Sequence, residues 1–124
     1  MTVTRNIDPR GAGDLLGHAP RACISFAADG GPQAVPVTLA WVDGRYLAGV
    51  AADAGHVPEP GDEVVLLVDD GVQFFDLRAV YVRGRADVTG APPGSGDDRT
   101  WFEVVPQLTV AWDYGQLREV DDAA

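Results

Sequence analysis

Glycine and proline recur along the whole chain and divide it into short segments. There are 15 glycines and 9 prolines among 124 residues, and clusters of these residues mark turns between ordered segments. Short segments separated by turn signals favour strands over long helices. The sequence therefore predicts a mostly-β protein with one domain over residues 1–124, frayed at 1–7 and 121–124.

Six segments have the apolar content or the alternation of strands. Asp43-Gly44 joins two of them directly, and an Asp-Gly pair in this position is a strong hairpin signal. Residues 63–68 are apolar on both faces, which is typical of a strand covered on both sides. The expected strands cover residues 22–27, 34–42, 45–50, 63–68, 77–88 and 108–120.

Little helix is expected. Residues 10–18 contain two adjacent leucines and suit two helical turns, and residues 100–104 suit one more turn. Pro36 lacks an N–H group, so it should lie near a strand start, a bulge or a sheet edge. These elements predict a six-stranded antiparallel split β-barrel with one or two short helices, because closure removes exposed strand edges.

The charge of the chain excludes several classes of function. All 9 basic residues are arginine, and 19 acidic residues bring the net charge to −10. Without lysine the chain has no P-loop and no Schiff-base amine. A negative field disfavours nucleic acid and anionic membranes, and no apolar run approaches the roughly 18 residues of a membrane span.

The cysteine and histidine content limits location and metal binding. Cys23 is the only cysteine, so no disulfide forms within the chain and a cytoplasmic location is expected. Together with His18 and His56 it cannot build a four-ligand zinc site, so no metal is expected. Cys23 leads an apolar segment and is interpreted as a small buried hydrophobe rather than a nucleophile.

No familiar catalytic motif is present. The glycines of residues 11–17 only superficially resemble a dinucleotide fingerprint, because the last is one place too late and no strand precedes them. Ser25 and Ser95 do not lie on a nucleophile elbow. The adjacent acids lie in expected turns, where solvated carboxylates are ordinary. No residue is therefore identified as an obligatory acid or base.

Three arginines form the one concentrated positive patch of this acidic chain. Arg83 and Arg85 are two residues apart on one expected strand, and Arg78 lies at its start. A planar guanidinium suits a phosphate or a carboxylate ligand. The alternative is a set of cross-strand ion pairs with aspartate or glutamate, and the sequence leaves both interpretations open.

The order of the segments resembles the pyridoxamine 5'-phosphate oxidase-like, FMN-binding split barrels, especially the small actinobacterial members. The resemblance covers residues 15–120 and rests on order and spacing together rather than on one motif. The matching segments are LLGHAPRACISFAADGG, QAVPVTLAWVDGRYLAGVAAD, DEVVLLVDD, FFDLRAVYVRGRADV and WFEVVPQLTVAWDYGQLREV.

This resemblance implies a homodimer that binds FMN or the deazaflavin coenzyme F-420 at the subunit interface. Members pass hydride or electrons between the cofactor and small molecules, so it implies an oxidoreductase of unknown substrate. Residues 35–38 would line the ring, and the small residues Ala48, Gly49 and Ala51 would leave room for it. Trp112 of the partner subunit would pack on it. The implied cofactor-binding residues are Val35, Pro36, Val37, Thr38, Ala51, His56, Arg78, Arg83, Arg85 and Trp112.

One segment departs from the family pattern. Residues 51–62 hold no lysine, arginine, serine or threonine where relatives grip a phosphate, and they hold acids that would repel one. Either the later arginines or His56 supply the anchor, or flavin binding is lost. The rival hypothesis is a non-catalytic split-barrel dimer that binds another small ligand or a protein. A further option is haem, with His18 or His56 as the axial ligand.

Overall fold

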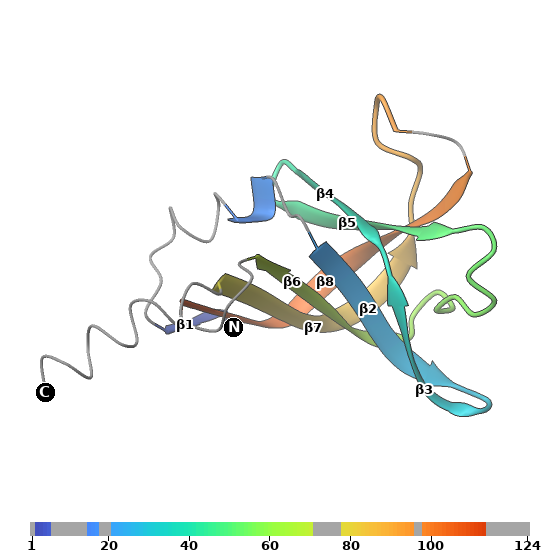
Figure 1. Cartoon of the computed structure of the whole chain (residues 1–124), viewed down its shortest axis with the longest axis horizontal. Helices are drawn as coiled ribbons and strands as arrows, with labels where there is room; N and C mark the ends of the chain where they lie inside the picture. Colours follow the sequence, from blue (N-terminus) through green and yellow to red (C-terminus); the bar gives the residue numbers. More distant parts are fainter. Residues whose placement is uncertain (1, 6–14, 18–20, 71–77, 96–97, 114–124) are drawn as a thin grey trace, which may run out of the picture.

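Eight strands in a single sheet make up the architecture. The computed structural model describes residues 2–5, 15–17, 21–70, 78–95 and 98–113, without the side chains of 2–5 and 112–113 (Figure 1). Among the described residues there is no helix long and apolar enough to cross a membrane. The strands are β1 (Thr2–Arg5), β2 (Arg21–Ala28), β3 (Gly31–Pro36), β4 (Thr38–Val42), β5 (Arg45–Ala51), β6 (Glu63–Asp70), β7 (Arg78–Val88) and β8 (Arg99–Asp113).

The two outermost strands of the sheet follow each other directly in the chain. The order is β3-β2-β6-β7-β8-β5-β4, with all neighbours antiparallel, and β1 pairs with β8 in parallel off this path. Only Val37 separates β3 from β4, and its N–H donates to the Ala22 carbonyl on β2 at 3.0 Å. The sheet must therefore curl until its edges meet, which makes a half-barrel (Figure 1).

The mostly-β class and the antiparallel sheet are confirmed, but the prediction of six strands is wrong. The expected strand at 34–42 is two strands, because the backbone leaves β2 at Pro36 and pairs with β5 from Thr38 onward. Residues 2–5 were expected to fray, yet they form β1 against β8. Pro36 ends an edge strand, as its missing N–H predicts.

The predicted helical turn at 100–104 is also wrong. These residues belong to β8, which begins at Arg99 rather than at 108. Phe102 and Val104 are buried in the core, so the alternation of a strand prevails over the local turn signal. Pro106 does not end β8. It pairs with Gly84 where the β7–β8 register shifts, and proline is tolerated at such bulges.

Two predicted elements extend beyond the described residues. Of the helix expected at 10–18, residues 15–17 are described, and they form a helical turn with both leucines buried. Of the strand expected at 108–120, the described part ends at Asp113. The remaining residues of both elements lie outside the described part of the chain.

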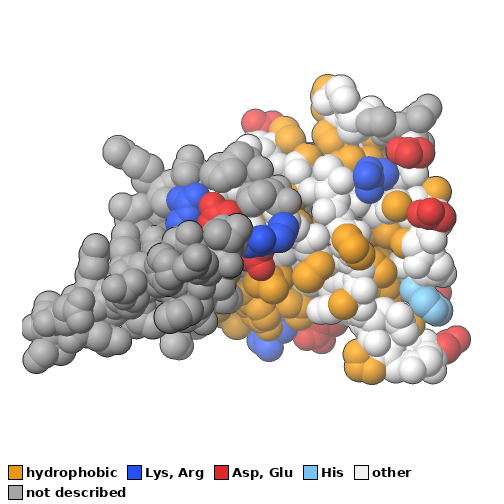
Figure 2. Space-filling model, viewed as in Figure 1, with side chains coloured by type: hydrophobic (Ala, Val, Ile, Leu, Met, Phe, Trp, Pro, Cys, Tyr) orange, Lys and Arg blue, Asp and Glu red, His pale blue; other side chains and the backbone are white. Residues whose placement is uncertain are grey.

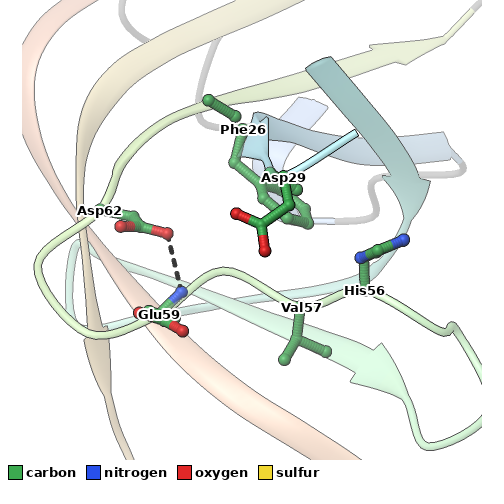
Figure 3. A pocket seen from close by; sticks show the side chains of 8 residues that line it. Phe26, Asp29, His56, Val57, Glu59 and Asp62 are labelled. Atoms are coloured by element: carbon green, nitrogen blue, oxygen red, sulfur yellow. Dashed lines mark hydrogen bonds between the residues drawn. The ribbon is translucent and has the colours of Figure 1, made fainter. Parts of the chain in front are cut away.

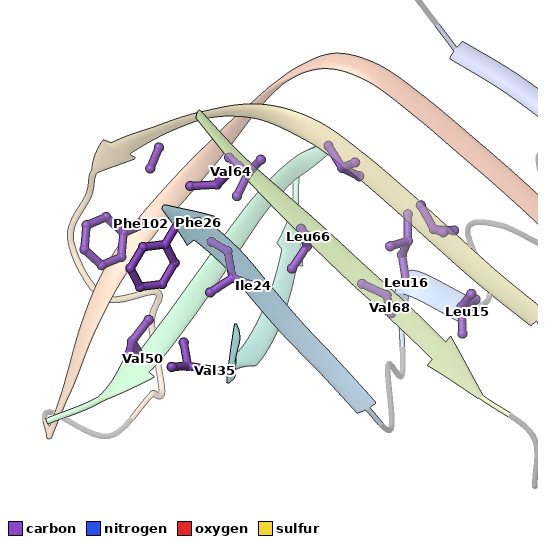
Figure 4. Packing of buried hydrophobic residues seen from close by; sticks show 14 of the residues in the cluster. Leu15, Leu16, Ile24, Phe26, Val35, Val50, Val64, Leu66, Val68 and Phe102 are labelled. Atoms are coloured by element: carbon purple, nitrogen blue, oxygen red, sulfur yellow. The ribbon is translucent and has the colours of Figure 1, made fainter. Parts of the chain in front are cut away.

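The hydrophobic core fills the concave side of the sheet. Figure 4 shows Phe26 and Phe102 close together within a cluster that includes Ile24, Leu66 and Val50, all at most 6% exposed. On β7, every second residue from Val80 to Ala86 is buried, and Arg83 and Arg85 between them are exposed. On β6 the outward side chains are partly exposed in this chain, so the cover expected over its second face is not supplied by the described residues.

The β7–β8 bulge generates a stability prediction. A methyl group on Gly84 would overlap the Val105 carbonyl, which is backbone of the neighbouring strand and cannot rotate away. We expect Gly84→Ala to lower the free energy of unfolding by about 1–3 kcal/mol, the usual cost of overpacking. Gly90→Ala is the control, because nothing lies within 4 Å of its added methyl group.

Chemical denaturation of the two variants and the unchanged protein measures the difference. The Gly90 variant should lie within about 0.5 kcal/mol of the parent. Equal stability of the two variants would contradict the tight strand contact at the bulge.

Candidate functional site

A surface pocket of about 400 Å³ lies where β3 passes into β4. Its walls come from this crossing, from the end of β5 and from the first residue of β8. We call it the crossover pocket. It is lined by Val35, Pro36, Val37, Thr38, Ala51, Asp53, Ala54 and Arg99.

Half of the residues implied to bind the cofactor meet in this pocket. Val35, Pro36, Val37 and Thr38 contribute the β3–β4 side, and Ala51 contributes the β5 side. The antiparallel pairing of β4 with β5 places Thr38 opposite Gly49, two residues before Ala51, so side chains distant in sequence face one space. Val35 and Val37 also pack against the core, which fixes the pocket floor to the barrel.

The space for a cofactor ring that was expected beside the small residues of 48–52 is only partly present. An indole occupies the outer side of β5 at Gly49, where an added methyl group would lie 2.8 Å from Cζ2 of Trp101. Trp101 is 4% exposed, and its buried Nε1 has no hydrogen-bond partner among the described residues. Open space therefore borders Ala51, whereas the position of Gly49 is filled by the protein itself.

Arg99 is a pocket residue that the sequence analysis missed. It opens β8 and pairs with Ala51 across the sheet, and it is exposed at the pocket wall. The residues after it were assigned to a helical turn, which hid its place on a strand. In the sequence, the apolar residues Phe102 and Val104 on either side of the charged Glu103 were the signal that could have revealed the strand.

The predicted anchor Arg78 forms an ion pair instead of lining the pocket. It lies opposite Asp70 in the β6–β7 register and makes two hydrogen bonds to that carboxylate, Nη2 to Oδ2 at 2.6 Å and Nε to Oδ1 at 3.2 Å. Of the two interpretations left open, the cross-strand ion pair holds for Arg78. It lies at the end of β7 that pairs with Asp113, far along β8 from Arg99.

Arg83 and Arg85 share the outer face of β7, as predicted, but neither lines the crossover pocket. Arg85 donates from Nη1 to the Gly61 carbonyl at 2.9 Å, which ties β7 to the segment before β6. Trp112 pairs with Ala79 near the end of β8, and its side chain lies outside the described part of the structure.

His56 lies in a different pocket, of about 270 Å³ (Figure 3). Asp29 points into this space from the end of β2, with His56 on one side and Glu59 and Asp62 on the other (Figure 3). The Glu59 N–H donates to Oδ2 of Asp62 at 2.9 Å. No group of three or more potential ligands among the described residues is arranged to hold a metal ion. Its carboxylates make this pocket unfavourable for an anion.

On the face shown in Figure 2, positive and negative side chains alternate. Figure 2 shows arginines next to acidic side chains beside the grey region, and single charged groups elsewhere on this face. This distribution places no continuous positive surface on the visible face, so an anion would have to be held by individual arginines.

Comparison with known proteins shows a shared fold. No family model and no curated protein matches the sequence. A conserved hypothetical protein from Mycobacterium tuberculosis has a TM-score of 0.69 at 19% identity, covering 90% of this chain and 88% of its own. An FAD-binding protein from Mycobacterium smegmatis has a TM-score of 0.65 at 18% identity, covering 83% and 93%.

An FAD-binding protein from Mesorhizobium loti has a TM-score of 0.55 at 18% identity, covering 83% of this chain and 90% of its own. The chain therefore has a split-barrel-like fold that it shares with proteins named for flavin binding. These identities are low enough that the likeness establishes the fold alone.

Cys23 is not an activated nucleophile. Burial raises the pKa of its thiol, and the carboxylate of Asp69 raises this pKa further. Arg21, two residues before Cys23 on β2, holds that same carboxylate through Nε at 2.7 Å. Cys23 is only partly buried, so the interpretation as a buried hydrophobe is confirmed only in part.

The raised pKa predicts slow alkylation of Cys23. We expect the pH midpoint of its reaction with iodoacetamide to lie above that of a free cysteine, about 8.5. Asp69→Asn removes the smaller cause and should lower the midpoint, while burial keeps it above the free value. A midpoint below that of free cysteine, followed by mass spectrometry across pH, would contradict this assignment.

Proposed function

We propose that this protein is a cytoplasmic, homodimeric flavin-binding protein that holds the cofactor ring in the crossover pocket. The observation that carries the proposal is the convergence of Val35, Pro36, Val37, Thr38 and Ala51 on one pocket. They are residues that the split-barrel resemblance implies for the cofactor, and they come from β3, β4, β5 and the Val37 connection. The names of two structural neighbours support a flavin as the ligand.

The chemistry of the pocket suits a flat, largely apolar ring. Val35 and Val37 provide an apolar floor anchored in the core, and burying a ring against it is favoured by the hydrophobic effect. Thr38, exposed at the start of β4, offers a hydroxyl that donates or accepts a hydrogen bond. Small-molecule sites commonly combine a mostly apolar lining with a few polar groups in this way.

A second copy of the chain would complete the site. The edge strand β4 carries Trp41 and Val42, which are 39% and 37% exposed. Exposed large apolar side chains on an edge strand favour an interface. The outward side chains of β6 are also only partly buried. The homodimer implied by the resemblance would cover such surfaces and close the open side of the pocket.

The bound flavin, as FMN, FAD or the deazaflavin coenzyme F-420, would supply hydride or electron transfer to a small substrate. The protein would bind and orient the ring and exclude water from it. Among the described residues no side chain presents itself as an acid or base for the reaction. The function proposed is thus an oxidoreductase in which the cofactor carries the chemistry.

One observation favours the rival, a split barrel without flavin. Asp53 lines the crossover pocket, and residues 51–62 contain no lysine, arginine, serine or threonine. Such a pocket would suit a small neutral ligand. Haem gains no support from His56, because the carboxylates around it would repel the haem propionates.

The flavin proposal predicts that a flavin binds the protein and that its affinity depends on residues of the crossover pocket. FMN, FAD and F-420 are titrated separately, with the quenching of cofactor fluorescence as the measurement. We expect at least one to bind with a Kd well below about 1 mM. Thr38→Trp should weaken that binding by at least about tenfold, because the indole would occupy the pocket.

Ala34→Trp is the matched control. Ala34 is exposed on neighbouring β3 and does not line the crossover pocket, so its variant should retain the parent affinity. Thermal unfolding of both variants verifies that each is folded. The proposal fails if no cofactor binds the parent protein, or if Thr38→Trp binds as tightly as Ala34→Trp.

A further inference from the structure

We propose that Arg99 is the residue that binds the terminal phosphate or acid group of the flavin. This inference rests on the proposed function and assigns the anion anchor of the same site to a residue outside the predicted set. The segment expected to grip a phosphate, residues 51–62, has no cationic side chain. An anchor for the phosphate would then come from an arginine elsewhere that lines the crossover pocket.

Three of the described arginines are held by carboxylates on neighbouring strands. Arg21 pairs with Asp69 at 2.7 Å and Arg45 pairs with Glu103 at 2.7 Å. Arg78 pairs with Asp70 at 2.6 Å, and both side chains are largely buried. Taking such a guanidinium for a ligand would leave its carboxylate unpaired, at a cost in free energy that grows with burial.

The other two predicted anchors are placed away from the pocket. Arg85 is turned toward the Gly61 carbonyl, and Arg83 lies opposite Val65 on the outer face of the sheet. Neither lines the crossover pocket. Arg83 and Arg85 are close in sequence, which suggested a phosphate site, but in the structure they lie on an exposed strand face, outside the pocket proposed to hold the flavin ring.

Arg99 differs from all of these in position and in pairing. It is the one cation in the lining of the crossover pocket, and no ion pair joins it to another residue that the structure describes. Its backbone is fixed by the pairing with Ala51 and by the hydrogen bond from the Ala52 N–H to the Asp98 carbonyl at 3.2 Å. A guanidinium on a strand held this way is positioned for a bidentate contact.

The charge balance of the pocket explains why this single arginine should matter. Asp53 lines the same pocket, and its carboxylate opposes a phosphate at close range. The guanidinium of Arg99 offsets the negative charge of Asp53. It also supplies hydrogen-bond donors, which the apolar side chains of the pocket do not have. Without Arg99 the pocket would keep its affinity for the neutral ring but lose its preference for an anionic terminus.

Comparing FMN with riboflavin isolates the phosphate. We expect the parent protein to bind FMN about tenfold more tightly than riboflavin, the scale of a charge-assisted contact at an exposed site. Arg99→Ala and Arg99→Gln should bring this ratio near one through a loss of FMN affinity. Arg45→Ala is the charge-matched control, since Arg45 pairs with Glu103 outside the pocket, and it should keep the ratio.

Several results would overturn the assignment while the flavin proposal stands. These are equal affinity of the parent for FMN and riboflavin, a ratio that persists in the Arg99 variants, or a ratio lost in Arg83→Ala instead. If neither flavin binds the parent, the proposed function fails, and the anchor is tested separately by titrating inorganic phosphate into protein with ¹⁵N-labelled arginine. A selective shift of the Arg99 Nε signal supports the anion anchor, and its absence rejects it.

Discussion

The connection through Val37 is the constraint on which the rest of this structure depends. It joins the two outermost strands of the sheet with one residue, so the sheet has to curl until β3 and β4 are adjacent. The Val37 N–H is not left unsatisfied at the crossing, because it donates to the Ala22 carbonyl on β2. Pro36 lacks a donor altogether, which suits the point where the backbone leaves one partner for another.

The same crossing creates the candidate site. Where the backbone changes partners, the pairing of β3 with β2 ends and that of β4 with β5 begins. A gap in the ladder exposes backbone and side chains that a continuous sheet would cover, and the crossover pocket lies there. Barrel closure and the proposed ligand binding therefore depend on the same few residues. The contacts of Val35 and Val37 with the core hold the backbone at this gap in place.

Residue alternation predicted which side chains face the core far better than it predicted strand partners. The burial of alternate residues on β7 and the Asp43-Gly44 hairpin, with both residues at positive φ, follow from local pattern. The division of residues 34–42 does not, because the apolar period continues through Val37 while the backbone changes neighbours. The start of β8 was missed for a related reason: its pairing with β5 is a long-range contact, which a local turn signal cannot reveal.

The arginines show the same limit on the functional side. Proximity in sequence placed Arg78, Arg83 and Arg85 together, but what each guanidinium meets is set by strand register. Register places Arg78 opposite Asp70 and turns it into a structural ion pair, whereas it places Arg99 beside Ala51 at the pocket wall. In a chain of net charge −10, carboxylates on neighbouring strands hold Arg21, Arg45 and Arg78 in ion pairs. Arg99 lines a pocket and has no ion pair to a described residue. Its guanidinium is therefore available to bind an anionic group of a ligand.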